Sequence, residues 1–246
     1  MILQRLTASL RKQDWFTVLI ETLIVVLGVF LGLQANNWNE ARKDRIVERQ
    51  TLDRLRVEVP ALMASRARVL EFSTARKDAL EGAAAKVFAA DSPDPLTQFE
   101  CLAITLSHIY TLPPDTSPMI EELVSTSRTA TLGDARVRAA LAEFLLARDD
   151  SRTVQRAVSI DIHQLSLEFP DLMKSVYQPA SGGAPGSART SCDLAGMREN
   201  GRFGNTLVSN QQRFLNYYDT GIVEVDARLG RLADALNIES PPKATP

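Results

Sequence analysis

The longest hydrophobic pattern in the chain is a run of apolar residues that begins at Trp15 and ends near Leu33. Two threonines and one glutamate are its only strongly polar members, and it contains no proline. As a helix continued to Trp38 it would be about 35 Å long, slightly more than the roughly 30 Å of a hydrocarbon core. Tryptophan at each end is typical of the two interfacial zones of a bilayer. The pattern predicts a transmembrane helix over residues 15–37.

The residues before this run, 1–14, are predicted to form a short basic amphipathic tail. A basic tail and an apolar run can also form a secretory signal peptide, with Leu33-Gln34-Ala35 as a passable cleavage site. The run is longer than the usual core of about 7–15 residues and holds a carboxylate, which favours an uncleaved anchor. Basic residues flank both ends, so the positive-inside rule gives nearly a tie. Since large following domains are translocated largely regardless of charge, we expect a cytoplasmic N-terminus and a periplasmic C-terminal domain.

Beyond the span, apolar residues recur at steps of three and four, which is the period of an amphipathic helix. The first stripe runs from Leu52 to Val87, and Pro60 is expected to kink or split that helix. We find no alternating pattern typical of a strand. The further helices predicted by the periodicity cover about 96–110, 118–127, 135–176 with a kink at Pro170, and 203–236.

The predicted fold is therefore all-α, with an N-terminal transmembrane helix followed by an extramembrane bundle of four to five helices. The bundle is assigned to residues 38–239, and residues 240–246 are predicted to be a disordered tail. Lysine and arginine number 28 against 30 acidic residues, so nothing suggests a nucleic-acid partner. The cysteines, Cys101 and Cys192, allow either one disulfide or two inert thiols.

No residue pattern indicates catalysis, a metal or a cofactor, so the chain is not expected to be an enzyme. His108 and His163 each lack a second ligand one helical turn away. The glycine-rich segment 182–186 follows no predicted strand and lacks the lysine of a phosphate-binding loop. Asp149 and Asp150 are adjacent, so on a helix they point about 100° apart.

One face of the predicted transmembrane helix carries Glu21, Gly28 and Gly32. Small residues let a partner helix approach closely, and a carboxyl group within lipid is expected to face protein. This face is a candidate interface for a homo-oligomer. The alternative is that Glu21 reaches the membrane interface and that the glycines are simply common residues of membrane helices.

Where the predicted helix leaves the bilayer, the sequence is unusually rich in amides around one tryptophan. The motif comprises Gln34, Asn36, Asn37, Trp38, Asn39 and Glu40. An interfacial collar anchored by Trp38 is favoured over a ligand site. The motif resembles that of an uncharacterised bacterial family of single-pass, membrane-anchored helical proteins, and Glu121–Thr126 also resembles that family. The resemblance implies a membrane location and an all-α domain, and it implies no activity.

These features favour an interaction or scaffolding module tethered in the bacterial inner membrane. Its expected partners are the lipid bilayer, an unidentified protein and a second copy of the chain. The alternative is an extracytoplasmic bundle that binds a ligand or acts as a sensor, and a pocket with convergent polar groups would favour it.

Overall fold

The computed structural model describes residues 15–89, 93–179 and 186–238. The tails predicted at 1–14 and 240–246 lie outside the described residues. The chain divides into two compact units, Met1–Thr51 and Leu52–Pro246. Apart from one two-stranded sheet, the described elements are helical, so the all-α prediction is confirmed.

Helix α2 is the longest element and runs over Trp15–Phe88. Pro60 lies inside it, so of the two expected outcomes, a kink or a split, the split does not occur. A proline removes one backbone hydrogen bond, but Val59 and Leu62 on either side are buried in the same hydrophobic cluster. Tertiary packing therefore keeps the segment helical across the lost bond.

The N-terminal part of α2 is, within the described residues, the one helix long and apolar enough to cross a membrane. None of this apolar stretch is buried against protein. A core helix of a soluble domain would bury such a surface, because exposing large apolar patches to water is unfavourable. The apolar run is therefore suited to lipid.

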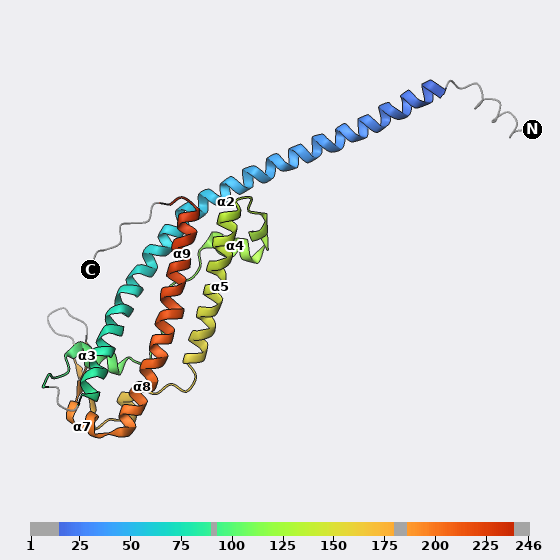
Figure 1. The fold of residues 1–246 in the computed structure, drawn as a ribbon. Helices are drawn as coiled ribbons and strands as arrows, with labels where there is room; N and C mark the ends of the chain where they lie inside the picture. The colour runs from blue at the N-terminus through green and yellow to red at the C-terminus, as the bar shows by residue number, and fades with distance from the viewer. Residues whose placement is uncertain (1–14, 90–92, 180–185, 239–246) are drawn as a thin grey trace, which may run out of the picture. The chain divides into compact units, whose positions relative to one another are not determined.

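The second unit is built on the later part of α2 together with α5 (Ala135–Val158) and α9 (Glu224–Ala235). These helices run side by side (Figure 1), and their apolar faces form one buried cluster. Helix α4 (Pro118–Ser125) adds residues to this cluster, as does Leu132, which directly follows the 3₁₀ turn Arg128–Thr131. The members buried most completely are Leu55, Val59, Ile120, Phe144, Val225, Leu232 and Ala233.

A second buried cluster lies where α2 ends. It is formed by the end of α2 with α3 (Gln98–Thr105), α6 (Leu165–Glu168), α7 (Leu194–Glu199), α8 (Gly201–Asn216) and the segment Tyr217–Val223 that follows α8. Its fully buried members include Ile104, Leu165, Phe203, Leu207 and Ile222. Along α2, the first cluster includes buried residues within 55–62 and the second includes buried residues within 80–87, and the buried positions between them are polar.

Two helix starts predicted from the sequence are confirmed by their capping bonds. The Ser117 hydroxyl accepts from the backbone N–H of Ile120 at the start of α4. The Asp134 carboxylate accepts from Arg136 and Val137 at the start of α5. Both bonds satisfy backbone donors that have no partner within a helix.

The helical pattern predicted up to Val176 was wrong beyond α5, because a hairpin occurs there. Strands β1 (Met173–Gln178) and β2 (Ser187–Cys192) pair antiparallel, from Met173 opposite Cys192 to Gln178 opposite Ser187. The apolar residues from 158 to 176 seemed to form one stripe, but Val158 ends α5, Leu165 lies in α6 and Val176 lies in β1. The other members of the stripe lie between these elements: Ile162, Phe169 and Leu172. The strands carry few buried side chains, so no alternating pattern marked them.

The disulfide, one of the two alternatives left open by the sequence, joins Cys101 and Cys192 in the structure. Their Cα atoms are 5.8 Å apart, and 91 residues separate them along the chain. The bond fastens the end of β2 to α3. Close by, the Gln98 side chain of α3 donates to the carbonyl of Thr190 at 3.0 Å and accepts from the Arg189 guanidinium at 3.0 Å, so hydrogen bonds also hold the hairpin to α3.

The helix predicted over 203–236 is interrupted by a π-helical segment, Tyr217–Val223, between α8 and α9. Its carbonyl at Gly221 accepts from the Ser151 hydroxyl of α5 at 3.0 Å. A Cβ atom at Gly221 would lie 3.3 Å from the ring of Tyr217 and 3.6 Å from Ser151. Glycine thus allows the close approach to α5. Segments of π-helix are rare and often occur at functional sites.

Candidate functional site

A pocket of about 510 Å³ opens beside the π-helical segment, and its volume is within the range of small-molecule sites. Its walls are one face of α2, the segment between α3 and α4, and the first residue of the π-helical segment. The residues that line it are Ser65, Arg68, Val69, Phe72, Ser73, Arg76, Thr111, Pro114 and Tyr217. All of them belong to the second unit.

Helix α2 supplies most of the lining because the contributing positions, from Ser65 to Arg76, follow one another at steps of three and four. Such positions share one face of a helix. Phe72 is 49% exposed and Val69 is half-buried, so this face offers an apolar wall. Arg68 is exposed and brings a positive charge to the same face.

Tyr217 forms the opposite wall and is 1% exposed. Its hydroxyl donates to the carbonyl of Thr111 and is also hydrogen-bonded to Ser73. Burial raises the pKa of Tyr217 to about 12, so the phenol is neutral at physiological pH. Its ring meets that of Tyr110 edge to face at 5.4 Å. The wall is therefore aromatic and uncharged.

Arg76 is the buried cation of the pocket, with an exposure of 5%. Its Nη2 donates to the carbonyls of Leu106 at 3.0 Å and Ile109 at 2.7 Å, just beyond the end of α3. Its guanidinium carbon lies 4.5 Å from the centre of the Phe214 ring. Burial lowers the pKa of Arg76, while the nearby tyrosines Tyr110 and Tyr217 act in the opposite direction.

Arg66, ten residues earlier on α2, does not line the pocket, but its hydrogen bonds connect the elements that form the walls. Its Nε donates to the carboxylate of Asp226, and its Nη1 donates to the carbonyl of Pro114 at 2.8 Å. Nη2 donates to the carbonyl of Ile222 in the π-helical segment at 3.4 Å. One side chain therefore connects α2 to the lining segment, the π-helical segment and α9.

The residues singled out from the sequence lie elsewhere. Glu21, Gly28 and Gly32 are on the exposed N-terminal part of α2, and a Cβ atom at either glycine would meet nothing within 4 Å. The motif from Gln34 to Glu40 is exposed on the same helix. Within it, the Asn36 amide donates to the Glu40 carboxylate at 3.0 Å.

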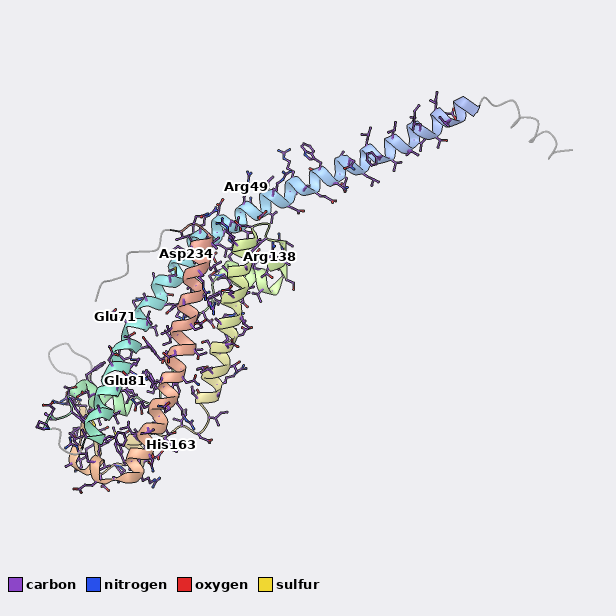
Figure 2. All side chains as sticks on the ribbon, viewed as in Figure 1. Arg49, Glu71, Glu81, Arg138, His163 and Asp234 are labelled. Carbon is purple, nitrogen blue, oxygen red and sulfur yellow. A yellow bond between two sulfur atoms is a disulfide. The ribbon has the colours of Figure 1, made fainter. Side chains whose placement is uncertain are left out.

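The two histidines lie in different surroundings. His163, in the segment after α5 (Figure 2), has Nδ1 at 2.9 Å from a carboxylate oxygen of Glu168. Burial lowers the pKa of His108, and the nearby charge of Arg76 acts in the same direction. Within the described ranges, no group of three or more His, Cys, Asp or Glu side chains is arranged to hold a metal.

No protein-family model, curated protein or solved structure matches the chain. The pocket is therefore interpreted from its own geometry. The resemblance of residues 34–40 to a family of membrane-anchored helical proteins stays a prediction.

Proposed function

We propose that this chain is a single-pass protein of the bacterial inner membrane whose helical domain binds a small ligand on the periplasmic side. The apolar, unburied window of α2 supports the anchor. The disulfide supports an oxidising compartment for the domain, because disulfides persist outside the cytoplasm. The N-terminal tail would then remain in the cytoplasm.

The observation that carries the binding function is Arg76. Its guanidinium is almost fully buried, lines a pocket of ligand size, and has no ion-pair partner among the carboxylates of the described residues. Pairing would compensate the cost of burying such a charge. The bonds of Arg76 to the carbonyls of Leu106 and Ile109 give it a structural role, but they supply no full negative charge to balance the guanidinium. Ligand binding is therefore favoured over the scaffolding function that the sequence suggested.

Photocrosslinking tests this function in native membranes. A photoreactive phenylalanine analogue at Phe72, in the pocket wall, is expected to form an adduct with a small molecule. The matched control is Phe88, which lies on the same helix, is 56% exposed and does not line the pocket. A small-molecule adduct at residue 72 that is absent at residue 88 supports the proposal. No adduct at residue 72, or the same adduct at both positions, contradicts it.

A second function, self-association through the membrane helix, is favoured by the open surface around Gly28 and Gly32. In lipid, close backbone contact and polar bonds supply the attraction between helices. In a transmembrane association reporter carrying residues 15–38, Gly28→Ile and Gly32→Ile are expected to abolish most of the signal. Glu21→Ala is expected to have a smaller effect, because one intramembrane polar bond contributes only about 0.6–2 kcal/mol.

The control for this association is Val26→Ile, which adds bulk on another side of the helix. It is expected to leave the signal unchanged. Unchanged association in both glycine variants would show that this face is not an interface.

A further inference from the structure

Three arginine side chains are buried in the described residues, and they differ in what balances their charge. Arg66 pairs with Asp226, and Arg148 lies 3.3 Å from a carboxylate oxygen of Asp149. Arg76 is the exception, because no carboxylate in the described part of the chain forms an ion pair with it. The carbonyls at the end of α3 offer only partial negative charge. The site therefore lacks a full counter-charge.

The hydrogen bonds of Arg76 show where a counter-charge would be held. Both of its bonds to protein leave from Nη2. A guanidinium also has N–H groups on Nε and Nη1, and in Arg76 these have no acceptor among the described residues. Neither nitrogen is fully enclosed, and the side chain lines the pocket. These N–H groups are available to an anion that enters from solvent.

We infer that the pocket holds a small organic acid whose carboxylate accepts hydrogen bonds from Arg76 and whose apolar body packs against Phe72 and Val69. The inference rests on the proposed ligand-binding function and specifies its ligand class. Arg68, exposed in the same lining, adds a second positive charge that attracts an anion to the pocket.

The other donors of the pocket favour a carboxylate over a phosphate. The Tyr217 hydroxyl already donates to the Thr111 carbonyl, and the Ser65 hydroxyl donates to the Leu62 carbonyl at 2.8 Å. Few donors besides the guanidinium groups are left to satisfy the several oxygens of a phosphate. A carboxylate needs fewer donors, and an apolar body also buries the exposed ring of Phe72.

Calorimetric titration of the full chain in detergent micelles tests the ligand class with three probes. Benzoate has a carboxylate and an apolar body, benzamide is its neutral analogue, and inorganic phosphate is an anion without an apolar body. We expect benzoate to bind at one site and the other two probes to bind at least tenfold more weakly. Equal binding of benzamide or of phosphate, or no binding of benzoate, overturns the inference.

Two variants assign the binding to this pocket. Arg76→Gln is expected to weaken benzoate at least tenfold and to leave benzamide unchanged, a charge-selective result that a purely structural role would not give. Because this change also removes bonds to α3, circular dichroism must first show native helix content. Phe72→Ala alters an exposed side chain and is expected to weaken benzoate at least threefold, whereas Phe88→Ala should leave it unchanged.

Benzoate binding that survives both Arg76→Gln and Phe72→Ala overturns the inference. The experiments can refute the ligand class without refuting the binding function. A specific adduct at residue 72 together with no benzoate binding would refute a carboxylate as the ligand. It would still support the pocket as a binding site. The absence of both results would refute the function as well.

Discussion

Replacement of Arg66 by methionine is expected to lower the free energy of unfolding by about 3–5 kcal/mol, because it leaves a partner charge without compensation in a largely buried site. Arg66 is 1% exposed, and the side chain of Asp226 is 22% exposed. The variant also leaves the carbonyls of Pro114 and Ile222 without their donor. Denaturant unfolding of the full chain in micelles, followed by circular dichroism, measures the loss.

The effect of this variant should also depend on pH. Burial raises the pKa of Asp226, and the Arg66 charge lowers it. Without Arg66 only the upward effect remains, so the native state prefers the neutral carboxyl more strongly. A raised native pKa means that stability is present below the usual value of 3.8 and is lost as the pH rises through the native pKa. The loss should therefore be larger at pH 7 than at pH 4.

A matched control is Arg231→Met, because Arg231 is half-exposed and its Nη1 lies 3.3 Å from Glu143. An exposed ion pair contributes about 0–1 kcal/mol, so this variant should change stability little. Arg66→Met combined with Asp226→Leu should recover part of the loss by removing the uncompensated charge. Equal effects of Arg66→Met and Arg231→Met would contradict the structural role given to Arg66.

Removal of the disulfide through Cys101→Ser with Cys192→Ser is expected to lower the free energy of unfolding by up to about 4–5 kcal/mol. The bond closes a loop of about 91 residues, and so it restricts the unfolded chain strongly. A chemical reductant should destabilise the native protein by a similar amount.

The doubly substituted variant is the control for the reductant, since it has no disulfide to reduce. Its stability should be the same with and without reductant. Native protein with unchanged stability in reductant, although its thiols become accessible to labelling, would contradict a structural contribution from this bond.

The sequence predicted the elements whose apolar positions repeat without interruption. The apolar run after Trp15 and the caps Ser117 and Asp134 mark helices by local chemistry alone, and the structure has each of those helices. The sequence allowed a disulfide but could not distinguish it from two inert thiols, because the contact between α3 and β2 depends on tertiary structure.

The pocket was not predicted from the sequence, although polar residues within the apolar stripe of α2 indicated it. Between Val59 and Leu80, the core positions at steps of three and four include Arg66, Ser73 and Arg76. Polar residues on a buried face need hydrogen-bond partners. Their occurrence at core positions therefore indicates a buried polar site. The partners themselves could not be predicted, because Tyr217, in the π-helical segment, and Asp226, in α9, are more than 140 residues away along the chain.

The most direct test of the whole proposal is the topology of the full chain in bacterial membranes. C-terminal fusions to two reporters, one active only outside the cytoplasm and one only inside, are combined with N-terminal sequencing of the membrane fraction. We expect the outside reporter alone to be active, with an uncleaved N-terminus before Trp15. Activity of the inside reporter alone, or a mature N-terminus at Asn36, would contradict a periplasmic domain held by its own membrane helix.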